Sequence, residues 1–182
     1  MFILLQLISL LYFFMNFKTI YHNNKDNVFN LALHYVQNVE DAQEITQDVF
    51  VSVHQNLEKY RNEANISTWI YRITINKCLD FIKAKQRKKR FVFITSLFGD
   101  DQKLKHDVAT FEHPGMILED EEALNELFQQ INDLPDNQKT VLILSKIEQK
   151  SQAEVAEIMQ ISVKAVEALF QRAKNNLEKK LL

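Results

Sequence analysis

The stretch Asp41-Ala-Gln-Glu-Ile-Thr-Gln-Asp-Val-Phe50 decides the fold, because its apolar residues recur at the spacing of an amphipathic helix. The inward face of that helix would carry Ala42, Ile45, Val49 and Phe50. The outward face would carry acidic and amide side chains, which are Asp41, Glu44, Gln47 and Asp48. We interpret this outward face as a docking surface for a partner, since its i, i+3 and i+4 spacing suits an exposed helix surface.

A second informative run follows directly, from Tyr60 to Asn76, and reads Tyr-Arg-Asn-Glu-Ala-Asn-Ile-Ser-Thr-Trp-Ile-Tyr-Arg-Ile-Thr-Ile-Asn. It gathers aromatic rings, amides, hydroxyls and arginine into a short loop and the start of a helix. Aromatic faces and amide groups are what proteins use to hold unstacked bases. The run therefore predicts contact with opened DNA.

The composition predicts an all-α protein. A chain of 182 residues with Gly 2 and Pro 2 has few residues that break helices, and its length suits two small helical domains. Its single cysteine, Cys78, excludes an internal disulfide and a thiolate metal cluster. Nothing in this pattern requires an oxidising compartment, so the expected location is the cytoplasm.

Charge is divided unevenly along the chain. Residues 16–90 hold 12 Lys and Arg against 8 Asp and Glu, or +4, whereas residues 91–182 hold 10 against 16, or −6. Eight residues near the end of the first half include six cations and no acid, namely Lys83, Lys85, Arg87, Lys88, Lys89 and Arg90. This basic run can lie along phosphates. The alternative is a solvated helix end, where the helix dipole alone favours cations.

The first residues, Met1 to Met15, are almost all apolar. The segment is shorter than the roughly 20 residues that span a bilayer, and it has neither the basic start nor the cleavage site of a signal peptide. We expect translation to begin at Met15, so that any membrane contact is indirect. The alternative is an anchor that lies on the membrane surface.

The remaining pattern predicts two helical domains and a linker. We expect a domain over 16–90, a linker over 91–120 and a second domain over 121–182. In the first domain, helices over 17–36 are expected to be interrupted at His22-Asn23-Asn24. A turn at Asn38, a helix to about Tyr60, and a helix capped by Ser67 or Thr68 are expected to follow.

The second domain carries the signature of a helix-turn-helix. Pro135 precedes a helix start at Asp136, and Ser151 with Glu154 three residues later forms a capping box before residues 152–159. Ser162 caps the next helix. The exposed face of that helix, able to read a major groove, carries Lys164, Glu167, Ala168, Gln171, Arg172, Lys174 and Asn175. This two-helix pattern alone fits an ordinary packed helical bundle equally well.

In combination, four motifs resemble a sigma-70 family factor of the extracytoplasmic-function group. They are Glu40-Asp-Ala-Gln-Glu-Ile-Thr-Gln-Asp-Val-Phe50, Ser67-Thr-Trp-Ile-Tyr-Arg-Ile-Thr-Ile-Asn-Lys-Cys-Leu-Asp80, Leu134-Pro-Asp-Asn-Gln and Arg172-Ala-Lys-Asn-Asn-Leu177. The resemblance covers about residues 17–90 and 122–181. It implies that the first domain is sigma region 2 and the second is the region 4 helix-turn-helix.

The resemblance also implies roles for particular residues. Asp41, Glu44, Gln47 and Asp48 match the face that docks on the clamp helices of RNA polymerase, and region 4 implies contact with the polymerase flap. The block that recognises the −10 element and captures a flipped base matches Tyr60, Asn62, Asn65, Ser67, Thr68, Trp69, Arg72 and Asn76. Tyr60 and Asn76 are the leading candidates for base capture, whereas Trp69 is expected mainly in the core.

For the −35 element, the resemblance favours Lys164, Gln171, Arg172 and Lys174. Glu167 departs from the basic or small polar residues that many family members place early in the recognition helix. A carboxylate weakens binding near phosphates unless it accepts a hydrogen bond from a cytosine amino group. The family also implies an anti-sigma factor as a further partner.

The sequence gives little support to catalysis. The five histidines are dispersed, and no glycine-rich phosphate loop is present, so neither a cofactor nor a metal is expected. Three functions remain open: a promoter-specificity subunit of RNA polymerase, a stand-alone helix-turn-helix regulator, and a membrane-associated interaction protein. We prefer the first, because the order of the motifs matches it throughout.

Overall fold

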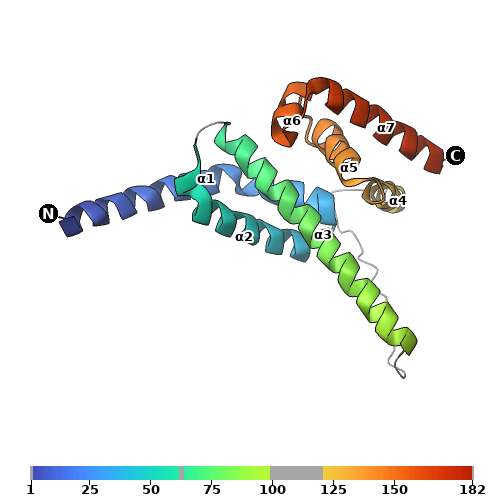
Figure 1. The fold of residues 1–182 in the computed structure, drawn as a ribbon, viewed down its shortest axis with the longest axis horizontal. Coiled ribbons are helices and arrows are strands. Elements are labelled where there is room, and N and C mark those ends of the chain that lie inside the picture. The colour runs from blue at the N-terminus through green and yellow to red at the C-terminus, as the bar shows by residue number, and fades with distance from the viewer. Residues whose placement is uncertain (1, 62–63, 99–120, 182) are drawn as a thin grey trace.

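The computed structural model describes residues 2–61, 64–98 and 121–181, and all regular elements in these ranges are helices (Figure 1). The expected all-α class is therefore confirmed. The elements are α1 (Phe2–Val36), α2 (Val39–Asn56), the 3-10 turn η1 (Leu57–Lys59), α3 (Ile66–Phe98), α4 (Glu121–Asn132), α5 (Asp136–Leu142), the π-helical turn η2 (Ile143–Ile147), α6 (Gln152–Met159) and α7 (Val163–Leu181).

The first unit is a bundle of α1, α2 and α3. Apolar side chains of all three helices are buried between them, among them Leu31, Ile45, Val49, Ile70 and Cys78. The inward face predicted for the stretch from Asp41 to Phe50 is confirmed, since Ala42 and Ile45 are buried with Val49. In Figure 1 the N-terminal part of α1 and the C-terminal part of α3 project beyond this bundle.

Helix α1 is continuous, so the expected interruption at His22-Asn23-Asn24 is wrong. The buried Asn24 donates from Nδ2 to the carbonyl of Ile20 at 2.8 Å, and its Oδ1 accepts from the Ser67 hydroxyl at 3.1 Å. Because both ends of the amide are hydrogen-bonded, it can be buried without breaking the helix. Ser67, on α3, supplies the partner that the local pattern could not reveal.

The start of α3 is set two or three residues earlier than expected. Asn65 accepts from the Ser67 backbone N–H through Oδ1 at 3.0 Å, and its carbonyl accepts from the Trp69 N–H at 3.0 Å. Asn65 therefore caps the helix, and the expected cap at Ser67 or Thr68 is wrong. At α2 the expected turn is confirmed, because the Asn38 side chain accepts from the Asp41 N–H at 2.8 Å.

The second unit, α4 to α7, contains the expected helix-turn-helix in α6 and α7. The capping box is confirmed: Ser151 and Glu154 each accept from the other's backbone N–H. The turn passes through Gln160, which adopts a left-handed conformation with φ 57°. Ser162 then accepts from the Ala165 N–H at 3.2 Å and begins α7.

The two units lie against each other, with α6 packed beside α3. Their apolar side chains belong to one continuous core. At the contact, Tyr35 is fully buried and donates to the Thr140 hydroxyl at 2.8 Å. In Figure 1 the second unit covers one side of α3 along its N-terminal half.

Several expectations concern residues outside the described ranges. Asn62 and most of the expected linker, 99–120, lie there, as do the side chains of residues 1–15. Helix α3 continues to Phe98, past residue 90, where the linker is expected to begin. Within the described residues, no helix combines the length and apolar character needed to cross a membrane.

Candidate nucleic-acid interface

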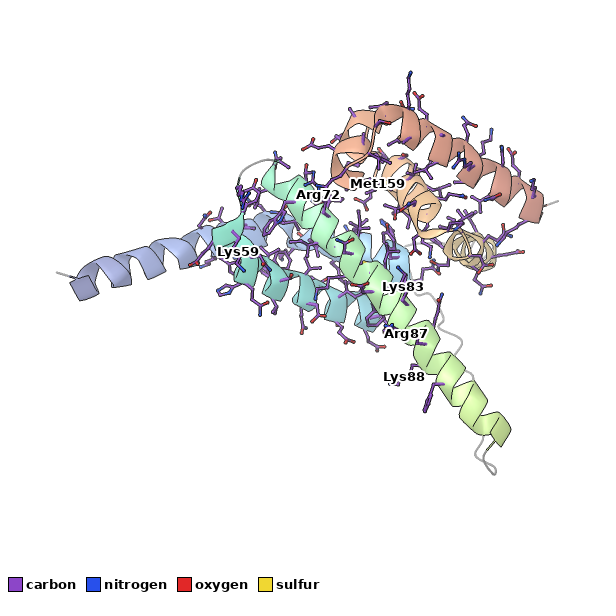
Figure 2. All side chains as sticks on the ribbon, in the orientation of Figure 1. Lys59, Arg72, Lys83, Arg87, Lys88 and Met159 are labelled. Carbon is purple, nitrogen blue, oxygen red and sulfur yellow. The ribbon has the colours of Figure 1, made fainter. Side chains whose placement is uncertain are left out.

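A small cavity of about 250 Å³ opens where the chain leaves η1 and enters α3. Two elements form it: η1 and the loop after it supply one wall, and the first two turns of α3 supply the other. Figure 2 labels Lys59, at the end of η1, and Arg72, on α3. The lining residues are Lys59, Tyr60, Arg61, Ala64, Trp69 and Arg72.

Aromatic rings give the cavity its shape. The rings of Tyr60 and Trp69 have centroids 5.1 Å apart and planes inclined by 33°, and the Tyr60 hydroxyl donates to the Ala64 carbonyl. Trp69 is partly buried and packs against the core while also lining the cavity. An arrangement of this kind offers ring faces for stacking beside cationic groups for phosphate.

Of the residues predicted for the −10 element, the structure brings Tyr60, Trp69 and Arg72 together at the cavity. Asn65 and Ser67 instead hold the local backbone and the Asn24 amide. Thr68 is partly exposed near the helix start. Asn76 is exposed on α3 but does not line the cavity, although a spacing of seven residues places it on the same side as Trp69.

Sequence reasoning missed three lining residues, Lys59, Arg61 and Ala64. Lys59 and Arg61 flank Tyr60, so an aromatic residue between two cations is a signal that could have identified them. Ala64 contributes its carbonyl, which anchors the Tyr60 hydroxyl. A backbone group of this kind leaves no signature in the sequence.

Arg72 has a second set of contacts, on the other unit. Its Nε donates to the Ile158 carbonyl at 3.2 Å, and its Nη2 donates to the Glu157 carbonyl at 2.9 Å. These carbonyls belong to the last turn of α6, where intrahelical donors run out and the helix dipole is negative. One cation therefore lines the cavity and holds the end of the first helix of the helix-turn-helix.

The predicted docking face on α2 is largely exposed. Glu44, Gln47 and Asp48 are open to solvent, whereas Asp41 is partly covered. Asp41 pairs with Lys85 of α3, and Asp48 lies 3.8 Å from the Lys77 Nζ. The face is thus acidic, with part of its charge balanced by α3.

The basic run along α3 is divided between internal contacts and solvent. Lys83 Nζ lies 2.9 Å from Asp136 of α5, and the hydrogen bond to this carboxylate raises the pKa of Lys83. Arg87 and Lys88 are exposed, and Figure 2 shows them on the projecting part of α3. The side chains of Lys89 and Arg90 lie outside the described residues.

On α7 the predicted groove-reading residues share an open surface. Lys164, Gln171 and Arg172 are exposed, as is Glu167. Lys174 lies 3.6 Å from Glu178 one turn later, an i, i+4 pair between two exposed side chains. The second unit therefore presents this recognition face to solvent.

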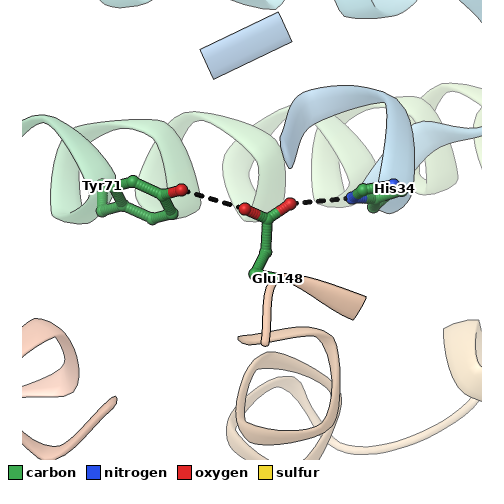
Figure 3. A network of polar contacts seen from close by, with 3 residues as sticks. All are labelled: His34, Tyr71 and Glu148. Atoms are coloured by element: carbon green, nitrogen blue, oxygen red, sulfur yellow. Dashed lines mark hydrogen bonds and ion pairs between the residues drawn. The ribbon is translucent and has the colours of Figure 1, made fainter. Parts of the chain in front are cut away.

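A polar network of His34, Tyr71 and Glu148 joins the two units (Figure 3). The Glu148 carboxylate accepts from the Tyr71 hydroxyl at 2.9 Å and lies 2.9 Å from the His34 Nδ1. Burial raises the pKa of Glu148, but the hydrogen bonds from His34 and Tyr71 outweigh this and leave that pKa below its usual value. Burial, followed by the nearby Glu148 charge, raises the pKa of Tyr71, so its phenol stays protonated and donates.

No group of three or more His, Cys, Asp or Glu side chains able to hold a metal ion occurs among the described residues. Cys78 is buried, and this burial raises its thiol pKa. A buried thiol with a raised pKa is a poor nucleophile.

Two family models match the chain, and together they cover more than half of it. Sigma-70 region 2 matches residues 20–88, and Sigma-70, region 4 matches residues 124–177. The chain is 29% identical over 161 residues to the ECF RNA polymerase sigma factor SigW of Bacillus subtilis, covering 86% of this chain and 84% of the relative. It is 26% identical over 154 residues to the RNA polymerase sigma-H factor of Pseudomonas aeruginosa, covering 85% and 80%.

Solved structures share the fold. CnrH in complex with the cytosolic domain of CnrY superposes with a TM-score of 0.60 at 21% identity, over 91% of this chain and 86% of that one. The sigma factor RpoE in complex with the anti-sigma factor NepR from Bartonella quintana gives 0.59 at 17% identity, over 91% and 96%. With both family models in their expected order, the chain belongs to the sigma-70 family, in its extracytoplasmic-function group, and functions as an RNA polymerase sigma factor in transcription initiation.

Proposed function

We propose that the two helical units divide promoter recognition between them. The first unit captures the opened −10 element at the cavity beside Tyr60, and the second reads the −35 duplex with the exposed face of α7. The observation that carries the proposal is the cavity itself, where two aromatic rings and three cationic side chains converge. Its position within the matched region 2 supports the same assignment.

The cavity suits a single unstacked base. Its volume of about 250 Å³ is below the roughly 300–1,000 Å³ of pockets that hold drug-sized ligands. Flipping a base costs a few kcal/mol, and stacking on an aromatic ring contributes about 1–3 kcal/mol per base. Tyr60 and Trp69 supply the rings, while Lys59 and Arg61 offer charges for the adjoining phosphates.

The α2 face serves the polymerase in this proposal. Glu44, Gln47 and Asp48 are exposed on one side of the helix, so an electropositive partner surface can approach them together. Because Asp41 is paired with Lys85, most of the remaining negative charge of this face comes from Glu44 and Asp48. We assign this surface to the clamp helices of core RNA polymerase.

On α7, Lys164, Gln171, Arg172 and Lys174 provide the −35 contacts. Their exposure supports duplex binding, and Arg87 and Lys88 on α3 can follow the phosphates between the two elements. Glu167 lies on the same surface, where it favours a cytosine amino group over a phosphate. The recognition face would thus read sequence as well as backbone.

The remaining expectations complete the proposal. The protein acts in the cytoplasm without cofactor or metal, and the polymerase performs the chemistry. An anti-sigma factor is a further proposed partner, supported by the solved structure of the similar RpoE with NepR. Contact with a membrane is then indirect, through such a partner.

The test is assembly with core RNA polymerase. The purified protein is mixed with the core enzyme, and co-elution and run-off transcription from a pool of promoter fragments are measured. The Asp48→Lys variant should abolish co-elution, because it reverses the charge of an exposed residue of the α2 face. Glu126→Lys makes the same charge change at an exposed position of α4 and should leave assembly intact.

Association with DNA but not with core polymerase would contradict the proposal and favour a stand-alone helix-turn-helix regulator. Equal loss with Asp48→Lys and Glu126→Lys would reject the α2 face as the docking site. The Asn76→Ala variant refines the −10 assignment: it should impair promoter opening more than closed-complex binding, although Asn76, four residues after Arg72 on α3, is not part of the cavity lining.

A further inference from the structure

Helix α7 turns one side to the core of the second unit and the opposite side to solvent. Val166 and Ala173 are buried on the inner side. In a helix with 3.6 residues per turn, a residue two positions away points to nearly the opposite side. The positions two residues from these buried ones are Lys164, Ala168, Gln171 and Asn175, and all four are exposed. This row therefore runs along the middle of the open side of α7.

Gln171 lies within this row, and its amide is better suited to bases than to phosphates. A neutral amide gains little from the charge of the DNA backbone. In the major groove, however, a glutamine can donate to the N7 of adenine and accept from its N6 amino group at the same time. Another amide of α7, on Asn176, is held inside the unit, since its Nδ2 donates to the Gln138 Oε1 at 2.8 Å.

Glu167 precedes Gln171 by one turn and is also exposed. The two residues are four apart, so their side chains are neighbours on the surface of the helix. A carboxylate weakens binding beside phosphates, but it can accept a hydrogen bond from the N4 amino group of cytosine. Adenine offers an amino group too, yet its N7 acceptor lies next to that group and repels a carboxylate. Glu167 is therefore matched to cytosine and Gln171 to adenine.

The cations of this side of α7 lie before and after the two residues. Lys164 is three residues before Glu167, and Arg172 follows Gln171, about 100° further round the helix. Both cations are exposed. Phosphate contacts fix the register of a protein on DNA, whereas contacts to base edges carry the sequence information. The arrangement places groups for phosphates on either side of two groups for bases.

We propose that Glu167 and Gln171 form a two-base reading pair on α7, in which the Glu167 carboxylate accepts from a cytosine N4 and the Gln171 amide makes a bidentate contact with an adenine. Four residues of helix advance about 6 Å and DNA advances about 3.4 Å per base pair, so the two bases lie one or two base pairs apart. The inference rests on the proposed function, because it takes α7 as the helix that reads the −35 duplex.

The test exchanges the two side chains in the full chain. The proteins compared are the unchanged chain, Glu167→Gln, Gln171→Glu and the double variant. Each is used, alone and with core RNA polymerase, to select duplexes from a pool of random sequence, and the bound DNA is sequenced. Circular dichroism and thermal unfolding check that every variant keeps the fold.

Glu178→Gln is the matched control. Glu178 is exposed and lies eleven residues after Glu167, which is close to three turns and places it on the same side of α7. The substitution makes the same change of charge as Glu167→Gln. It also removes the ion pair in which the Glu178 carboxylate lies 3.6 Å from the Lys174 Nζ, which affects phosphate binding but not the choice of base.

We expect the unchanged protein to select a cytosine and an adenine one or two base pairs apart. Glu167→Gln should convert the cytosine position to adenine, and Gln171→Glu should convert the adenine position to cytosine. The double variant keeps the net charge of α7 and should exchange the order of the two bases. Each conversion should change the preference at its position by about fivefold or more. Glu178→Gln should select the same sequence as the unchanged protein.

Three results overturn the reading pair. The first is an unchanged protein that selects neither base, alone or with polymerase. The second is conversion at only one of the two positions. The third is a set of variants that differ in overall affinity but select the same bases, which is the result expected from charge alone. The double variant makes this distinction sharp, because the two changes of charge cancel in it.

Run-off transcription with core polymerase separates this inference from the function on which it rests. If the chain alone shows the exchanged preferences while no promoter-dependent transcript is made, the reading pair stands and the promoter assignment fails. If transcripts are made while all variants select the same bases, the promoter assignment stands and the reading pair fails.

Discussion

The two candidate DNA surfaces differ in what the rest of the molecule does to them. On α7 the predicted contacts Lys164, Gln171 and Arg172 are exposed, and the recognition face is presented to solvent. In the first unit, Arg72 lines the cavity but donates to α6, so that surface is partly engaged by the second unit. The comparison teaches that docking of the two units restricts one surface far more than the other.

This difference has a physical origin in the ends of helices. The exposed surface along the side of a recognition helix is made of side chains. The cavity is built at the start of α3, beside the end of α6, where Arg72 donates to the Ile158 carbonyl and also to the Glu157 carbonyl, which accepts from the Gln160 N–H as well. An arginine placed between a cavity and such a helix end binds the carbonyls unless a stronger acceptor, such as phosphate, replaces them.

The largest expected effect is a loss of DNA affinity at the cavity of the first unit. Tyr60→Ala removes the ring that stacks near Trp69 and should weaken binding of single-stranded promoter DNA by about 1–3 kcal/mol. Duplex −35 binding should be unchanged, because α7 is untouched. Fluorescence anisotropy with the two DNA probes measures both.

Two matched variants sharpen this result. Tyr60→Phe keeps the ring and loses only the hydroxyl bond to the Ala64 carbonyl, so it should retain most of the affinity. Arg172→Ala should produce the reverse pattern, with weaker duplex binding and a salt dependence lower by about one phosphate contact. If Tyr60→Ala weakens both probes equally, the separation of the two surfaces is wrong.

A smaller effect is expected at the buried part of the unit contact. Tyr35→Phe removes the hydroxyl that donates to Thr140 in a buried site. The net loss of one neutral hydrogen bond costs about 0.5–1.5 kcal/mol. Urea unfolding should show the lower free energy, and the radius of gyration should rise as the docked state weakens.

Tyr21→Phe is the control for that change, since Tyr21 lies on the same helix and is exposed. It removes a hydroxyl at a site where water can replace any lost hydrogen bond. Equal stability of the Tyr35→Phe variant and the unchanged protein would show that the Tyr35 hydrogen bond does not hold the units together.

Local features of the fold were predictable from the sequence. The capping box of Ser151 and Glu154 and the turn at Asn38 depend on residues three apart, which a reader of the sequence can see. The inward face of α2 follows from the same short-range period. Such features are predictable because cause and effect lie within one helical turn.

Features that depend on distant partners were not predictable. The continuity of α1 depends on Asn24 meeting Ser67, 43 residues away, and Glu148 meets His34 across 114 residues. The cap of α3 at Asn65 was missed because three neighbouring residues could each serve as a cap. The second role of Arg72 required the position of α6, which no local pattern contains.

The smallest predicted effect is a dependence of docking on pH. Glu148, facing His34 of α1, Tyr71 of α3 and the nearby Lys150, has its pKa lowered in the docked state below the usual value of a glutamate carboxyl. A carboxylate whose pKa is lowered by docking stabilises the docked state fully above its ordinary pKa. That contribution is lost as the pH falls through the lowered pKa.

Small-angle scattering as the pH falls below 4.5 should therefore show the unchanged protein expanding more than Glu148→Gln, which has no carboxylate to protonate at this position. The comparison with this variant removes the response of the other carboxylates, which titrate in both proteins. Identical acid expansion in the two would mean that the charge of Glu148 does not hold the units together. The engagement of Arg72 would then have to be explained by the α6 carbonyls and the shared apolar core alone.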